Sequence, residues 1–95
     1  MGKEKGKRSP EDMIYDTLQW ALTRGGITRT ELAQDIGIPS NRRETYIAYL
    51  TGQATKQTLL RQSNNGTNKF VITDVGKGFM IDYDTFKSKY HLDKL

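Results

Sequence analysis

The stretch ITRTELAQDIG, residues 27–37, carries the clearest local structural signal in this 95-residue chain. Thr28 and Glu31 have the spacing of a capping box, in which each side chain accepts a hydrogen bond from the other residue's backbone N–H. Ile27 and Leu32 stand at the two positions of a hydrophobic staple, which packs around such a helix start. The sequence therefore predicts a short helix of about two turns that begins after Thr28.

A second helix is expected directly after the first. Gly37 fits the left-handed residue that follows a helix, and Ser40 or Asn41 suits the cap of the next one. That helix would run from about residue 41 to 51 and end at Gly52. Its expected apolar side is Tyr46, Ile47 and Leu50, and its polar side is Asn41, Arg42, Thr45 and Tyr49.

A longer helix is predicted ahead of this pair. Ser9 suits its cap, Pro10 its first position, and Gly25 and Gly26 its end. The apolar residues at helical spacing, expected to face the core, are Ile14, Leu18, Ala21 and Leu22.

A hairpin and a last helix are predicted after the pair. Asn65-Gly66 between the extended runs 58–62 and 68–73 is typical of a β-hairpin. The segment 53–58, QATKQT, is compatible with either a loop or a continued helix. Thr73 suits the cap of a helix over about residues 74–90. Its aromatic and apolar residues recur at spacings of three and four: Val75, Phe79, Tyr83, Phe86 and Tyr90.

The order helix, helix, helix, hairpin, helix is that of a winged helix-turn-helix domain, a mainly helical α+β fold. In ELAQDIGI the small residues Ala33 and Gly37 are four apart and flanked by apolar residues, a pattern that lets two helices cross closely. FVITDVGKGFMIDYDTFK, residues 70–87, is similar to the phrase that joins wing and last helix in small archaeal winged-helix regulators. The chain thus resembles PadR-like and MarR-like proteins over residues 10–90, within a domain spanning 9–95.

The resemblance implies a homodimer that binds double-stranded DNA, with the third helix in the major groove and the hairpin as a wing on flanking DNA. The residue types agree, because Arg pairs with guanine and Asn with adenine. Which of residues 41–46 face the groove is left open by the sequence. The predicted DNA-binding residues are Thr28, Arg29, Ser40, Asn41, Arg42, Arg43, Thr45, Tyr46, Tyr49, Lys56, Arg61, Asn64, Asn65, Thr67, Asn68 and Lys69.

The charge distribution points to an anionic partner. Fifteen Lys and Arg against eleven Asp and Glu give a net charge of +4, and no acidic residue lies between 45 and 73. Residues 1–8 are expected to form a flexible basic arm that lies along the DNA backbone or in a minor groove. Its cations are Lys3, Lys5, Lys7 and Arg8.

The aromatic stripe of the last helix is read as a dimer seam, since a small three-helix core does not easily cover four turns of aromatic side chains. The alternative is that it forms ordinary core. Trp20 lies off the main stripe of the first helix, and either joins the seam or fills the edge of the core. The predicted dimer-interface residues are Trp20, Phe79, Tyr83, Phe86 and Tyr90.

The sequence contains no catalytic constellation, so we expect no enzyme, cofactor or metal site. It has no cysteine and no apolar run of membrane-spanning length, which favours a cytoplasmic protein without membrane contact. The expected function is a transcriptional regulator, most simply a repressor. Two alternatives remain: a plasmid-partition protein that spreads on a centromere site and bridges to other segregation proteins, and a winged-helix protein-interaction module that binds no DNA.

Overall fold

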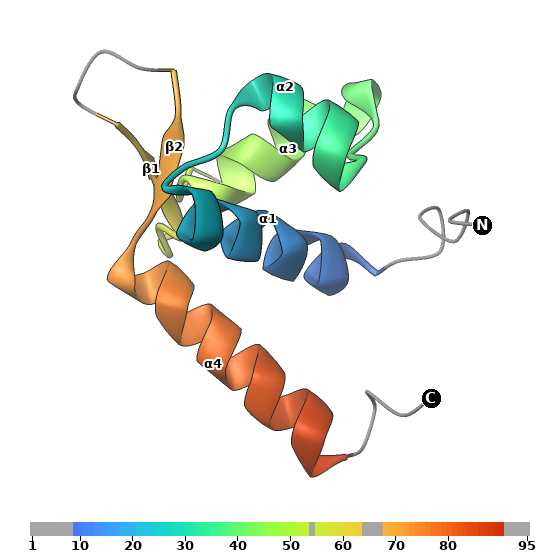
Figure 1. The fold of residues 1–95 in the computed structure, drawn as a ribbon, viewed down its shortest axis with the longest axis vertical. Helices are drawn as coiled ribbons and strands as arrows, with labels where there is room; N and C mark the ends of the chain where they lie inside the picture. Colours follow the sequence, from blue (N-terminus) through green and yellow to red (C-terminus); the bar gives the residue numbers. More distant parts are fainter. Residues whose placement is uncertain (1–8, 54, 64–67, 91–95) are drawn as a thin grey trace.

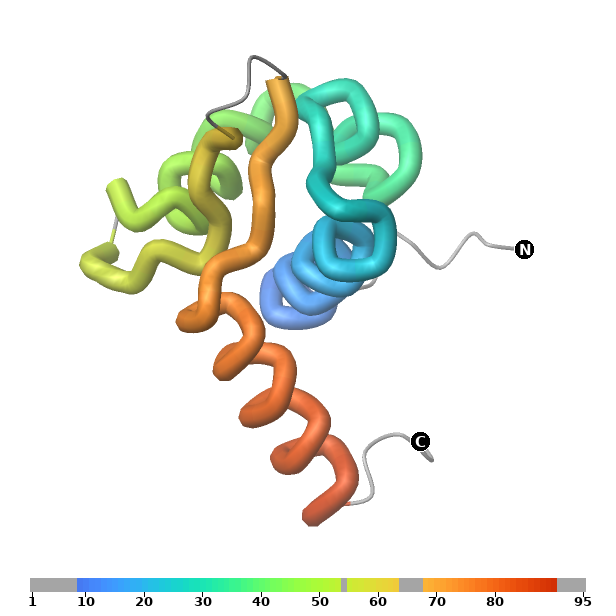
Figure 2. The backbone as a smooth tube through the Cα atoms, turned by 60° about the vertical axis from the view of Figure 1, so that its left-hand side comes forward, coloured from blue at the N-terminus to red at the C-terminus, as the bar shows by residue number. Residues whose placement is uncertain are grey.

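The computed structural model describes residues 9–53, 55–63 and 68–90, which form a mainly helical α+β domain. In Figure 1 the hairpin and α2 lie at one end of the molecule and α4 projects from the other. Figure 2 shows the same separation from another side. None of the helices in these ranges combines the length and apolar character needed to cross a bilayer. The elements are α1 Pro10–Arg24, α2 Arg29–Glu31, η2 Leu32–Ile36, α3 Ser40–Leu50, β1 Leu60–Gln62, β2 Phe70–Ile72 and α4 Asp74–Lys89.

Helix α1 begins and ends where its sequence predicts. The Ser9 hydroxyl accepts from the Asp12 N–H at 3.1 Å, and Gly25 ends the helix with φ 77°. The predicted inward face is wrong at Leu22, which is exposed. Thr17 is buried in its place, and its hydroxyl donates to the Met13 carbonyl at 2.8 Å, which satisfies the donor inside the helix.

The short second helix is confirmed, but its second turn is wider than expected. The Thr28–Glu31 capping box is present with both of its hydrogen bonds. After α2 the backbone continues as the π-helical turn η2, and the N–H groups of Gly37 and Ile38 both donate to the Leu32 carbonyl. Gly37 has φ 88°, a value that suits glycine and lets the chain reverse into α3.

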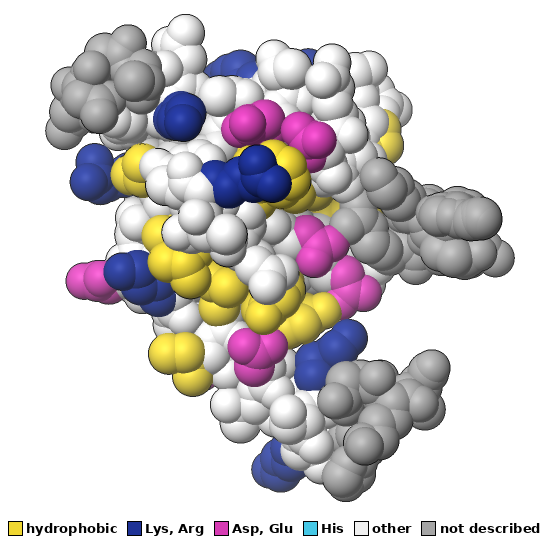
Figure 3. Space-filling model, viewed as in Figure 1, with side chains coloured by type: hydrophobic (Ala, Val, Ile, Leu, Met, Phe, Trp, Pro, Cys, Tyr) yellow, Lys and Arg dark blue, Asp and Glu magenta, His cyan; other side chains and the backbone are white. Residues whose placement is uncertain are grey.

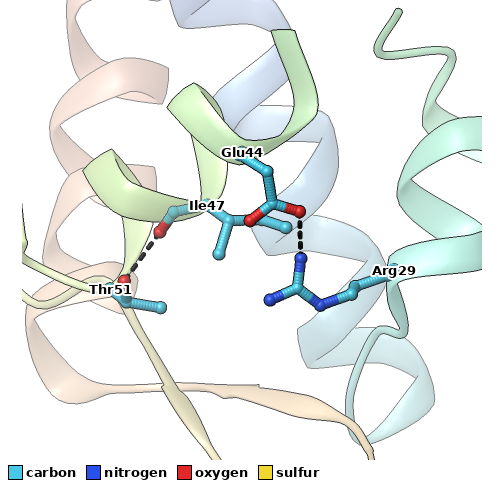
Figure 4. A network of polar contacts seen from close by, with 4 residues as sticks. All are labelled: Arg29, Glu44, Ile47 and Thr51. Atoms are coloured by element: carbon cyan, nitrogen blue, oxygen red, sulfur yellow. Dashed lines mark hydrogen bonds and ion pairs between the residues drawn. The ribbon is translucent and has the colours of Figure 1, made fainter. Parts of the chain in front are cut away.

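Helix α3 starts one residue earlier than predicted and has no side-chain cap. Pro39 occupies the cap position, so the expected capping role of Ser40 or Asn41 is wrong. At the other end Thr51 donates to the Ile47 carbonyl at 2.7 Å (Figure 4), and Gly52 turns the chain with φ 85°. The described residues between Gly52 and β1 form a loop, which resolves the ambiguity of QATKQT.

The predicted hairpin is confirmed with shorter strands. Strands β1 and β2 pair antiparallel, with Arg61 opposite Val71. A third segment joins them, because Ile27 forms a bridge with Phe70 through two backbone hydrogen bonds of 2.9 and 2.8 Å. The sequence analysis did not foresee this bridge, which ties the residue before α2 to the hairpin.

The core lies where α1, η2, α3 and the hairpin meet. Its largest fully buried apolar side chains come from five separate segments of the chain. They are Leu18, Ile27, Leu32, Leu50 and Leu60.

Helix α4 packs against α1, with contacts that extend into its second half at Tyr83 and Lys87. Thr73 caps it, with its hydroxyl accepting from the Gly76 N–H at 3.0 Å. The rings of Tyr15 and Tyr83 stack with centroids 4.4 Å apart, and the Tyr83 hydroxyl donates to Asp12. Lys87, in the last turn of α4, still reaches Asp12 with an Nζ–Oδ1 distance of 3.7 Å, whereas Phe86 on another side of the helix is exposed.

Gly76 and Gly78 give a matched test of this packing. A Cβ on Gly76 would overlap the Leu59 carbonyl oxygen and lie 2.8 Å from Ile72 Cγ1, whereas a Cβ on Gly78 meets nothing within 4 Å. We expect Gly76→Ala to lower the free energy of unfolding by about 1–3 kcal/mol. Gly78→Ala should raise it by about 0.5–1 kcal/mol, because alanine is the better helix former. Urea denaturation measures both, and equal effects would contradict the close approach at Gly76.

Candidate nucleic-acid interface

The start of α3 forms the centre of the candidate interface. Asn41, Arg42 and Thr45 are all exposed there. No side chain caps this helix start, and no acidic residue lies in its first turn, so the positive end of the helix dipole is not offset locally. The arrangement suits an anion or a hydrogen-bond acceptor approaching along the helix axis.

The two adjacent arginines differ in their environment. Arg42 is exposed, so its guanidinium is available to a partner. Arg43 is half-buried, and its Nε is enclosed without a hydrogen-bond acceptor among the described residues. Arg42 is therefore the better candidate for contacting a base, a distinction that the sequence left open.

Tyr46 and Tyr49 do not stand with the exposed polar residues. Both are half-buried and pack against the core, where they line an apolar groove with Ile14 and Phe79. We therefore no longer count them among the residues that face a DNA groove. Tyr46 was expected on the apolar side of α3 and Tyr49 on its polar side. The exposed Thr45 lines the same groove, at its edge toward solvent.

The start of α2 lies beside the hairpin and close to α3. Thr28, Arg29 and Thr30 line one hollow with Gln62 and Asn68, which brings a helix start and the loop end of the hairpin together. The hollow thus groups Thr28, Arg29 and Asn68, three of the residues predicted to bind DNA. The hollow opens next to α3, because Arg29 reaches across to that helix.

Arg29 forms an ion pair with Glu44 of α3, seen from close by in Figure 4. The same guanidinium lies 5.8 Å from the centroid of the Phe70 ring, so this residue of α2 links its helix to both α3 and β2. Glu44 is missing from the predicted site. Its spacing of three residues from Asn41 was the signal that could have placed it on the same side of α3.

The remaining predicted cations are spread more widely. Arg61 is exposed on the hairpin, and Lys69 is half-buried. Lys56 is exposed in the loop before β1, where its neighbour Gln57 lines a hollow with Val75 of α4. The structure therefore separates Lys56 from the start of α3. Asn64, Asn65 and Thr67, and the arm residues Lys3, Lys5, Lys7 and Arg8, lie outside the described residues.

The charge on the described surface is mixed. On the face seen in Figure 3, Lys and Arg side chains are interspersed with Asp and Glu, and apolar side chains gather over the middle of the molecule. A contact with DNA would therefore depend on the position of individual side chains more than on a continuous basic patch.

The predicted dimer-interface residues fall into two groups. Phe79 and Tyr83 are half-buried, and their rings are 6.3 Å apart along the part of α4 that packs within the domain. Phe86 and Tyr90 are both 56% exposed. Trp20 is half-buried, with the Arg24 guanidinium 4.1 Å from its ring centroid, and lines a hollow beside η2.

The capping box at the start of α2 makes stability depend on pH. The Thr28 N–H donates to the Glu31 carboxylate at 2.9 Å and lowers the pKa of Glu31. Because the unfolded value is about 4.3, Glu31 stabilises the fold above that pH, and this contribution is lost as the pH falls through the folded pKa. We expect Glu31→Gln, which keeps an oxygen acceptor, to flatten the fall of the Tm between about pH 5 and 3.

Thr28→Ala serves as the comparison for this measurement. It removes an uncharged acceptor that receives the Glu31 N–H at 3.1 Å. It should therefore destabilise the protein by about 1 kcal/mol at every pH. An acid limb of unchanged steepness in Glu31→Gln would contradict the assignment of this pH dependence to Glu31.

A scan against protein-family models, a search of curated proteins and a search of solved structures each return no match for this chain. Its function is therefore inferred from its own residues and their arrangement.

Proposed function

We propose that this chain is a winged helix-turn-helix protein that binds a specific site in double-stranded DNA as a homodimer and acts as a transcriptional repressor. Helix α2 with η2 and helix α3 correspond to the helix-turn-helix, the hairpin to the wing, and α4 to the dimerisation helix. The observation that carries the proposal is the uncapped start of α3, where Asn41, Arg42 and Thr45 are exposed.

The chemistry of these side chains suits the major groove. Arg42 matches the two acceptors of guanine, and Asn41 matches the donor and acceptor of adenine. Thr45 follows Asn41 by four residues, so it lies one turn further along the same side of α3. A helix fits the major groove, which is about 12 Å wide, and base edges are read from such a position.

The surrounding elements suit contacts with the DNA backbone. The start of α2, at Thr28 and Arg29, reaches α3 at Glu44, and the loop end of the hairpin lies on the other side of the same hollow. Phosphate contacts of this kind fix the orientation of a recognition helix without reading sequence. Arg61 on the exposed side of the hairpin adds a cation that would reach flanking DNA.

The proposed dimer rests on the apolar side of α4 that the domain leaves uncovered. Val75, Phe86 and Tyr90 are each about half exposed. They lie along one side of the helix with Phe79, at spacings that return to the same face. A second copy packed on this face would remove that apolar area from water.

Arg42 gives the first test of DNA recognition. If it contacts a guanine, Arg42→Ala should weaken binding to a selected site by about 1–3 kcal/mol and binding to random duplex much less. Lys77→Ala removes one positive charge from the exposed surface of α4 and should change both affinities little. Fluorescence anisotropy with a site selected from random DNA measures both. Equal losses on the two DNAs would exclude base reading by Arg42.

Phe86 tests the dimer. Phe86→Glu places a charge in the proposed seam, so the protein should sediment as a monomer at concentrations where the parent chain is a dimer. Ile81 is 65% exposed on the opposite side of α4, and Ile81→Glu should leave the dimer intact. A parent chain that sediments as a monomer throughout, or monomers from both variants, would contradict this seam.

A further inference from the structure

Glu44 is the one acidic residue in α3, and it lies at the junction of three elements. Its carboxylate pairs with the Arg29 guanidinium, which also lies over the Phe70 ring. The side chains of Arg29 and Glu44 remain 52% and 73% exposed. The pair therefore stands at the surface between the starts of α2 and α3.

Fold stability does not account for this carboxylate. An exposed ion pair contributes little to folding, because water screens it and two long side chains must be ordered. The cost of Glu44 to DNA binding is direct, since a negative charge beside a phosphate-facing surface repels the backbone. Glu44 also holds the Arg29 guanidinium in an ion pair. Arg29 lies in the first turn of α2, where its charge would otherwise suit a phosphate.

We infer that Glu44 is a selectivity residue: it suppresses binding to non-matching DNA and favours a site that offers a base amino group to its carboxylate. The inference rests on the proposed DNA-binding function and deepens it. In free protein, Glu44 neutralises Arg29. On the matching site, Arg29 moves to a phosphate and Glu44 accepts a hydrogen bond from cytosine N4 or adenine N6.

The geometry of α3 and the chemistry of the bases both favour a contact between Glu44 and a base amino group. Glu44 follows Asn41 by three residues, so the two side chains lie one turn apart on neighbouring parts of the α3 surface. Guanine presents only acceptors in the major groove, and thymine presents an acceptor and a methyl group. A carboxylate facing either of them has no donor to bind, and its desolvation is not compensated. Cytosine and adenine each supply the missing donor.

The test compares Glu44→Gln with a matched loss of charge elsewhere. Glutamine keeps the shape and one acceptor of Glu44 but removes its charge and releases Arg29. We expect Glu44→Gln to tighten binding to random duplex by about three- to tenfold and to steepen the salt dependence by about one phosphate equivalent. Asp74→Asn removes one negative charge from the exposed surface of α4, on the side away from Val75, Phe79 and Phe86, and should give a much smaller change.

A second pair of variants tests whether Glu44 acts through Arg29. In an Arg29→Gln background the released cation is absent, so the gain from Glu44→Gln on random duplex should shrink by at least half. Sites selected from random DNA by Glu44→Ala should also lose the preference for cytosine or adenine at one position that the parent chain shows, because alanine offers no acceptor to a base amino group. Circular dichroism of each variant checks that the fold is retained.

The outcomes separate the inference from the proposed function. If the parent chain binds no duplex even at low salt, the DNA-binding proposal fails and the inference fails with it. If the parent chain binds a selected site but Glu44→Gln behaves like Asp74→Asn on random duplex, DNA binding stands and the selectivity role is overturned. An undiminished gain in the Arg29→Gln background would overturn the role of the ion pair.

Discussion

The backbone bridge between Ile27 and Phe70 is the constraint on which the rest of the structure depends. Its two hydrogen bonds fix the start of α2 against the hairpin, and both side chains are buried beneath the bridge. The approach is close enough to require glycine at the preceding position. Gly26 has φ 148°, and a Cβ there would lie 3.3 Å from the Phe70 carbonyl oxygen. Arg29, two residues beyond Ile27, is thereby held over the Phe70 ring.

A small core explains how the outer elements are arranged. Five segments each contribute one large, fully buried apolar side chain, so each element is held by few contacts. Helix α4 is held by the stack of Tyr15 on Tyr83, and by the close approach of Gly76 to Leu59. Phe86 and Tyr90 are exposed on a side of α4 that these contacts do not cover, so this side is available to a second copy of the chain. In the proposed dimer this geometry would set the distance between the two copies of α3.

The candidate interface combines weak general attraction with specific groups. On the face seen in Figure 3 both signs of charge are mixed, so non-specific attraction of that face to phosphates would be modest. The exposed Arg42 and Asn41 supply base-reading chemistry at an uncapped helix start. Glu44 opposes DNA that does not match it, under the inference drawn above. Selectivity would then come from both attraction and repulsion at neighbouring positions of α3.

The sequence by itself determined the local signals. The Ser9 cap, the Thr28–Glu31 capping box, the left-handed Gly37 and the Thr73 cap each depend on residues a few positions apart. Those interactions form whatever the rest of the chain does, so element order and most element ends were predictable. The cap of α3 was not predictable in this way, because Pro39 occupies the position expected for Ser40 or Asn41.

Only the tertiary structure decided which side of each element is covered. Periodicity marks an apolar face, but the neighbouring element determines whether a given residue lies beneath it. Thus Leu22 is exposed while Thr17 is buried, and Tyr49 packs inward while Arg42 faces outward. The Ile27–Phe70 bridge and the Arg29–Glu44 pair join residues 43 and 15 positions apart. Such contacts depend on how the helices cross, which no local spacing specifies.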